Sequence, residues 1–220
     1  MNEYLLLKFF HLLLFVYWLG GDLGTFYASR FVSDSELTPA ARATALKIMM
    51  GVDMAPRLCM PLILPFGVHM AAIQGLMQVP TIALVAMWLG CVGWLAMVVS
   101  VHHYSGKPLG ATIGRIDFWF RVGIILGACG LAVFGLLTGK ILAAQWLAVK
   151  LLIFAGAVAC GLMIRVYLKP FGPAFGRLMS HGPDDETNRV IASAIARCRP
   201  LVYLIWAGLL VSASLGLHLL

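Results

Sequence analysis

Six long apolar runs, separated by more polar segments, constrain this 220-residue chain more than any other feature. About 20 apolar residues is the length that a helix needs to cross the ~30 Å hydrocarbon core of a bilayer. Hydrophobic residues make up 61% of the chain and charged residues only 11%, which leaves no room for a separate soluble domain. The sequence therefore predicts an all-α fold: a polytopic membrane bundle of about six transmembrane helices in a single domain, residues 1–220.

Hydropathy and the positions of glycine and proline place the expected helices. The expected spans are residues 4–29, 47–77, 81–102, 118–137, 145–168 and 201–220. Thr38 and Asp184 are typical helix N-caps, and they predict two helices on the membrane surface, at about 39–50 and 184–199. Pro200 is expected to separate the second surface helix from the last span. The proline- and glycine-rich segment 170–183 is expected to be irregular.

The distribution of positive charge predicts the orientation. Thirteen of the 16 lysine and arginine residues lie on the side reached after the first, third and fifth spans, and the other three are Lys8, Lys140 and Lys150. By the positive-inside rule both termini lie outside the cytoplasm, and in a bacterium the bundle would sit in the inner membrane. Because the basic residues are scattered between apolar spans, the lipid bilayer is an expected partner and nucleic acid is not.

The first apolar run carries a stripe of polar residues. On a helix with ~100° per residue these residues fall within an arc of roughly 100°. They are Tyr4, Lys8, His11, Trp18, Asp22, Thr25 and Ser29. Ionisable groups at membrane depth cost ~2.5 to 3.5 kcal/mol each. The stripe is therefore expected to face protein, a cofactor or water, and it is the primary candidate for a functional surface.

Two histidines are expected at matched depth on neighbouring antiparallel helices. His11 lies about seven residues inside the outer end of the first span, and His69 about eight residues inside the same end of the second. Such a pair can ligate one b-type haem from both faces, an arrangement that suits electron transfer. Pro61 and Pro65 can reorient the helix that carries His69. A hydrogen-bonded His69 without a metal is the alternative.

The same comparison of depth pairs Asp22 with Arg57 and puts Asp53 one turn nearer the cytoplasmic surface. An acid and a base at one depth in a membrane usually neutralise each other, so a structural ion pair is expected. A proton relay, or the binding of a haem propionate by Arg57, is the alternative. Lys150 lies close to the level of His11 and is a second candidate to hold a propionate or a substrate carboxylate.

Methionine makes copper the alternative cofactor to haem. Thioether and imidazole groups together select Cu(I), although methionine is also an ordinary core residue. The second and third spans contain Met49, Met50, Met54, Met60, Met70, Met77, Met87 and Met97.

Short motifs in the first and fifth spans resemble a known family. They are Lys8-x-x-His11, Trp18-Leu19-Gly20, Arg30 at the helix exit, and Trp146-x-x-x-Lys150-Leu151. They resemble the HemJ-type bacterial protoporphyrinogen oxidase and the related CopD-type copper-resistance membrane proteins. The resemblance implies a small helical bundle that binds haem b, with His11 as ligand and Arg30 and Lys150 as basic residues near the porphyrin. Residues 20–24, residues 53–69 and the long loop before the last span depart from the HemJ pattern, which favours an uncharacterised haem-binding relative over the oxidase itself.

The expected function is therefore that of a b-type haem membrane protein. It would carry out electron transfer or redox chemistry linked to quinone or porphyrin, with a redox partner protein or a second copy of the chain as partner. The alternatives are an oxidoreductase acting on protoporphyrinogen IX, a CopD-like copper transporter and a haem-free structural membrane subunit. No GxGxxG, P-loop, HExxH or GxSxG motif occurs in the chain, so nucleotide-dependent chemistry and hydrolysis are not indicated.

Overall fold

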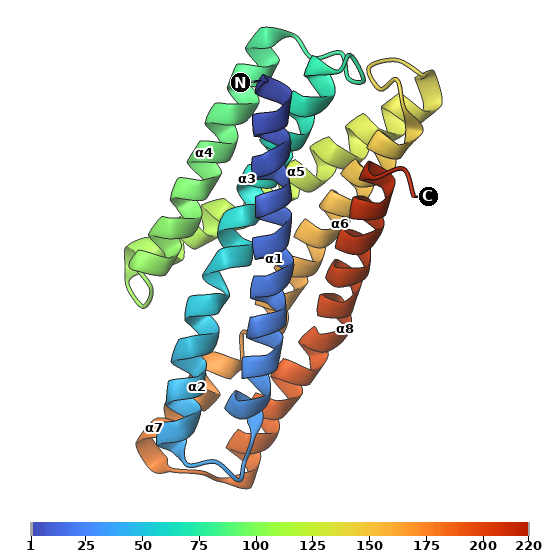
Figure 1. The fold of residues 1–220 in the computed structure, drawn as a ribbon. Coiled ribbons are helices and arrows are strands. Elements are labelled where there is room, and N and C mark those ends of the chain that lie inside the picture. Colours follow the sequence, from blue (N-terminus) through green and yellow to red (C-terminus); the bar gives the residue numbers. More distant parts are fainter. Residues whose placement is uncertain (1, 220) are drawn as a thin grey trace.

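Residues 2–219 are described by a computed structural model, and they form eight α-helices (Figure 1). The helices are α1 (Glu3–Ser33), α2 (Pro39–Val52), α3 (Met54–Ile73), α4 (Thr81–His103), α5 (Pro108–Thr138), α6 (Gln145–Tyr167), α7 (Phe171–His181) and α8 (Asp185–Gly216). Six helical segments in this part of the chain are long and apolar enough to cross a membrane. The predicted all-helical architecture with six candidate spans is confirmed.

The six long helices form a closed ring. Going around it, α1 packs on α3, α3 on α4, α4 on α5, α5 on α6, α6 on α8, and α8 again on α1. Both chain ends lie at one end of the bundle, which we call the terminal end, and the short helices α2 and α7 lie at the other, which we call the α2–α7 end (Figure 1). A buried core around Trp18, Trp94 and Val158 packs inside the ring.

Helix α2 begins at the predicted residue and runs directly into the second span. The Thr38 side chain accepts a hydrogen bond from the backbone N–H of Ala41, and Pro39 occupies the first helical turn, as expected for a helix start. A break at Asp53 separates α2 from α3. Pro61 and Pro65 lie buried inside α3, which continues through both.

Two predictions about the last third of the chain are wrong. The segment 170–183 is mostly helical, because Phe171, Phe175 and Leu178 recur at helical spacing and give α7 an apolar stripe that packs against α8. Pro200 does not interrupt α8, which is continuous from Asp185 to Gly216. A proline removes one backbone hydrogen bond, and buried residues on both sides of Pro200 offset that loss.

Helix α5 begins ten residues before the expected start of its span, at Pro108 rather than at residue 118. Proline at the first helical position favours this earlier start because its missing N–H would have no partner there. The extension brings Asp117 and Arg121 into one helix, one turn apart, where both side chains are buried.

The α2–α7 end is held together by a buried arginine. Arg42 is only 1% exposed; its Nε donates to the Val32 carbonyl oxygen at 2.9 Å and its Nη1 to Oδ1 of Asn188 at 2.7 Å. These bonds connect the end of α1, helix α2 and the start of α8. Leu178 and Ile191 pack with Val32 in a buried apolar cluster at this end.

Candidate functional site

A cavity of about 450 Å³ lies inside the terminal end of the ring. Its walls come from α1, α3, α6 and α8, and the loops after α3 and α5 contribute Leu76, Met77 and Leu142. These loops are joined by backbone hydrogen bonds from Gln78 to Ile141 and from Ala143 to Leu76, each 2.9 Å long. The volume lies within the ~300 to 1,000 Å³ range of small-molecule and cofactor sites.

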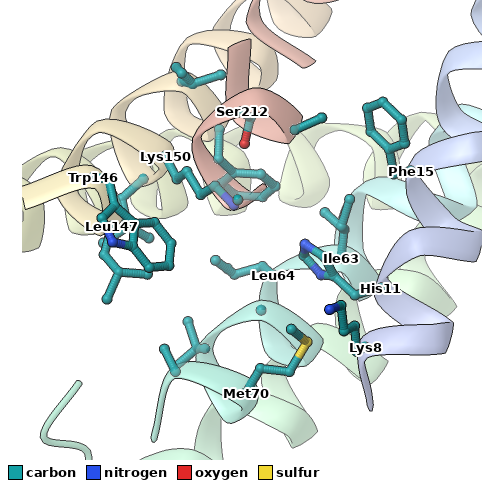
Figure 2. Close-up of a pocket in the computed structure, with 18 of the residues that line it drawn as sticks. Lys8, His11, Phe15, Ile63, Leu64, Met70, Trp146, Leu147, Lys150 and Ser212 are labelled. Atoms are coloured by element: carbon teal, nitrogen blue, oxygen red, sulfur yellow. The ribbon is translucent and has the colours of Figure 1, made fainter. Parts of the chain in front are cut away.

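The cavity lining is mostly apolar, with a few polar groups on opposite walls. Helix α1 contributes Lys8 and His11, and α6 contributes Lys150. Figure 2 shows His11 and Lys150 reaching into the cavity from these two helices. No aspartate or glutamate is among the lining residues. The cavity is therefore an apolar space with two lysines and no carboxylate to neutralise them.

His11 is held at the cavity wall by the shape of α3. Its Nδ1 atom is buried and has no hydrogen-bond partner. A methyl group at Gly67 would lie 3.0 Å from the His11 Cε1 atom, so the missing side chain of Gly67 makes room for the imidazole ring. Buried polar atoms in native proteins are nearly always paired, so the unpaired nitrogen makes His11 a candidate ligand-binding residue in the cavity wall.

Lys150 and its neighbours form the opposite wall. The Lys150 Nζ atom lies 5.0 Å from the centre of the Trp146 ring, a favourable position for a cation over an aromatic face. The ring of His218 packs edge-on against Trp146, with 5.5 Å between the ring centres. Within residues 2–219 Lys150 takes part in no ion pair. Its charge is therefore free to attract an anionic group into the cavity.

His69 does not line this cavity. It lies on the side of α3 that faces α4, where its ring centre is 6.3 Å from that of Trp88. Its Nε2 atom is 3.6 Å from Oε1 of Glu3, and its Nδ1 atom is buried without a partner. The structure thus brings His11 together with Lys8 and Lys150, but not with His69, and it places Met70 and His218 in the cavity lining.

The remaining charged residues singled out as site candidates, Asp22, Arg30, Asp53 and Arg57, lie outside the cavity lining, nearer the α2–α7 end. Arg57 forms an ion pair with Asp53, one turn before it, rather than with Asp22. The Oδ2 atom of Asp22 is buried and has no hydrogen-bond partner. Arg30 stacks over Phe26 in the last part of α1, with 5.8 Å from its guanidinium carbon to the ring centre, about 19 residues from His11.

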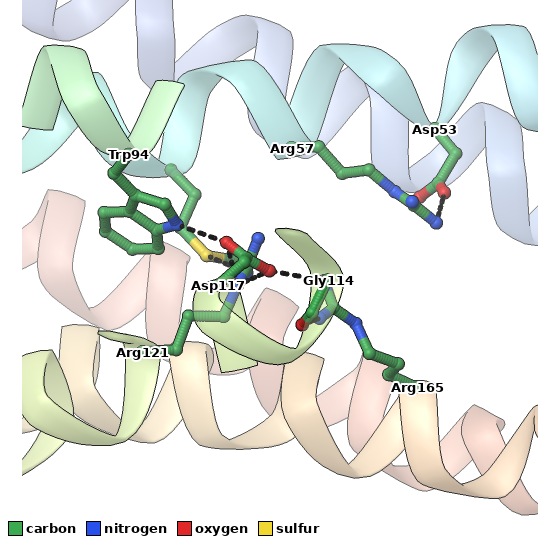
Figure 3. Close-up of polar contacts among 8 residues, drawn as sticks. Asp53, Arg57, Trp94, Gly114, Asp117, Arg121 and Arg165 are labelled. Carbon is green, nitrogen blue, oxygen red and sulfur yellow. Dashed lines mark hydrogen bonds and ion pairs between the residues drawn. The ribbon is translucent and has the colours of Figure 1, made fainter. Parts of the chain in front are cut away.

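A buried cluster of polar residues between α4, α5 and α6 was missed by the sequence reasoning (Figure 3). Asp117 accepts hydrogen bonds from Trp94 Nε1 at 3.0 Å, from Arg121 Nε at 3.0 and 3.2 Å, and from an Arg165 nitrogen at 2.7 Å. Asp117 is 0% exposed and Arg121 5%. Because the expected span began at residue 118, Asp117 fell in a loop. The signal in the sequence was the spacing of Asp117 and Arg121, because residues four apart on a helix can form an ion pair.

This buried cluster carries an excess of positive charge, because two guanidinium groups share one carboxylate. The Nη1 atom of Arg121 donates a hydrogen bond to the Met60 Sδ atom at 3.3 Å, and the Arg121 guanidinium carbon lies 5.2 Å from the Trp94 ring centre. Sulfur and aromatic contacts thus complete the surroundings of the charge. None of these residues lines the cavity at the terminal end, and we assign the cluster a structural role.

No protein-family model, no curated protein and no solved structure matches the chain. The HemJ and CopD resemblance therefore stays a hypothesis. The geometry of the cavity is the basis for a functional assignment.

Proposed function

We propose that the cavity at the terminal end binds one b-type haem and that the protein is a multi-pass membrane haem protein that transfers electrons. The single observation that supports this most strongly is the lining itself. An imidazole with an unpaired buried nitrogen faces an apolar cavity from one wall, and an unpaired lysine faces it from the other.

The available residues fit the chemistry of haem. Imidazole is a common axial ligand of haem iron, so His11 would hold the metal. Lys8 and Lys150 would attract the two propionates, whose charges no acidic lining residue would oppose. Bound there, haem would supply one-electron redox chemistry.

The arrangement favours a different second ligand from the one expected from the sequence. Met70 and His218 line the cavity, whereas His69 does not. Both thioether and imidazole are known axial ligands of haem. In this proposal His69 is therefore a structural residue of the α3–α4 interface, close to Trp88 and Glu3.

Absorption spectroscopy tests the proposal and separates the two histidines. The protein would be produced with ample haem supply, purified in detergent, and measured as a reduced-minus-oxidised spectrum. We expect a b-type spectrum in the wild type and in His69→Ala, and its loss in His11→Ala. Loss of the spectrum in both variants would instead support His11 and His69 as the pair of haem ligands. A colourless wild type would overturn haem binding, and copper in that preparation would favour the CopD-like alternative.

A further inference from the structure

The cavity follows the terminal half of α1. Tyr4 and Trp18 both line it, and at ~1.5 Å per residue the fourteen residues between them span ~21 Å. The hydrocarbon core of a bilayer is ~30 Å thick. Trp18, 2% exposed, closes the deep end of the cavity. The remaining fifteen residues of α1, from Trp18 to Ser33, span another ~22 Å toward the α2–α7 end.

Asp22 lies one helical turn beyond Trp18, just beyond the floor of the cavity. Its Oδ2 atom is buried without a hydrogen-bond partner, and so is Oγ1 of Thr25. Residues three apart on a helix are neighbours on its surface, so these two unpaired oxygen atoms belong to the same face of α1. Buried groups of this kind are usually bridged by ordered water, which needs two or more polar partners. Asp22 and Thr25 supply two such partners.

The charged groups around Asp22 leave it without a cation. Asp53 lies near enough to act on it electrostatically, but Arg57 is paired with Asp53, and no ion pair within residues 2–219 includes Asp22. On α5, Arg121 is bound to Asp117.

The remaining neighbours of Asp22 are uncharged or reach the surface. Helix α3 also contributes the Cys59 thiol, on which Asp22 acts electrostatically, and Trp18 on α1 lies within reach of the Asp22 carboxyl group. The side chains of Asp53 and Arg57 are 21% and 40% exposed. The Asp53–Arg57 pair thus links the surroundings of Asp22 to the outside of the bundle.

We propose that Asp22 is a proton-binding group between the floor of the cavity and the partly exposed Asp53–Arg57 pair. A carboxyl group without a cationic partner crosses between its charged and neutral forms by gaining or losing one proton. Reduction of a group bound in the cavity adds one electron to the apolar interior, and uptake of one proton by the Asp22 carboxylate balances that charge. The proton-binding part stands by itself; the coupling to reduction rests on the proposed function.

Infrared spectroscopy of the protein in lipid nanodiscs tests the proton-binding part without any cofactor. Difference spectra between acidic and alkaline buffer, in H₂O and in D₂O, report the C=O band of a protonated carboxyl group. We expect a band that Asp22→Asn removes, that Asp22→Glu shifts and that Glu36→Gln, an exposed control, leaves unchanged. A band unaltered in both Asp22 variants would overturn the proposal. The Glu variant keeps the test decisive if the Asn variant does not fold.

A redox titration tests the coupling separately. If the wild type holds haem, we expect its midpoint potential to fall as the pH rises and this dependence to be lost in Asp22→Asn but not in Glu36→Gln. The same dependence in Asp22→Asn would overturn the coupling while haem binding stands. If the wild type binds no haem but shows the infrared band of Asp22, proton binding is supported, whereas the coupling and the proposed function are refuted.

Discussion

At the scale of single residues, two aspartate–arginine pairs with the same spacing differ in their surroundings. Asp117 and Arg121 are buried, with side chains 1% and 6% exposed, whereas Asp53 and Arg57 are partly exposed. Removing one partner of a buried ion pair leaves an uncompensated charge and costs about 3 to 5 kcal/mol, whereas an exposed pair one turn apart contributes only about 0.3 to 0.5 kcal/mol.

We therefore expect Asp117→Ala to destabilise the protein strongly and Asp53→Ala to have a small effect. Thermal unfolding of both variants in the same detergent, followed by circular dichroism, measures the difference. Similar unfolding temperatures for the two variants would show that the Asp117 cluster does not contribute to stability as its geometry indicates.

A second residue-scale prediction concerns Gly67, whose missing side chain gives His11 its place. In Gly67→Ala the new methyl group would lie 3.0 Å from His11 Cε1, so the imidazole has to move. We expect weaker haem binding or an altered spectrum. Gly93→Ala is the matched control, because a methyl group there meets no atom within 4 Å; it should leave the spectrum unchanged. An unaltered spectrum in Gly67→Ala would argue against His11 as the ligand.

At the scale of elements, the start of α8 depends on the ionised form of Asp184. Its side chain accepts hydrogen bonds from Thr187 N at 2.8 Å and Thr187 Oγ1 at 2.6 Å. These bonds, helped by Arg177, lower the pKa of Asp184 below its usual value of 3.8. Because the folded pKa is lower than the unfolded one, the cap contributes fully above pH ~3.8 and is lost as the pH falls through the folded pKa.

Amide hydrogen exchange in the first turn of α8 measures this effect. We expect exchange to accelerate, relative to the intrinsic rate, as the pH falls below about 3.8. Asp184→Asn keeps a capping side chain but has no acidic proton, so its first turn should respond less to pH. An equal response in the variant would assign the acid sensitivity to another group.

The sequence was sufficient for elements with a strong pattern and failed where tertiary packing decided the outcome. The apolar runs and the caps at Thr38 and Asp184 located most helix starts correctly. Helix α7 was missed because proline and glycine dominate its sequence, while its stability comes from Phe175 and Leu178 packing under α8. Pro200 was predicted to end a helix, whereas packing of buried residues on both sides of it keeps α8 continuous.

The candidate site shows a similar division. The polar stripe predicted that Lys8 and His11 share one face of α1, and both line the cavity. The depth of a residue along a helix can be counted from the sequence. The direction in which its side chain points around the helix axis cannot be counted reliably through Pro61 and Pro65. The sequence therefore left open whether His69 faces His11, and the structure places it outside the cavity lining.

At the scale of the whole molecule, the ring of six long helices puts both chain ends on one side. The bias of positive charge predicts that this terminal end faces away from the cytoplasm. Labelling of single introduced cysteines with a membrane-impermeant maleimide tests the orientation in intact cells. We expect labelling at Lys140→Cys, between α5 and α6, and none at Glu36→Cys, between α1 and α2, until the membrane is permeabilised. The wild type, with five native cysteines, sets the background, and the reverse pattern would invert the topology.

The central claim is that the cavity at the terminal end holds haem, and native mass spectrometry of the purified protein tests it most directly. Ala213→Trp, which fills the cavity from α8, and Val211→Trp, on the exposed side of the same helix, form a matched pair. We predict one bound haem in the wild type and in Val211→Trp, and none in Ala213→Trp. An empty wild type, or equal haem occupancy in folded Ala213→Trp and Val211→Trp, would contradict the account.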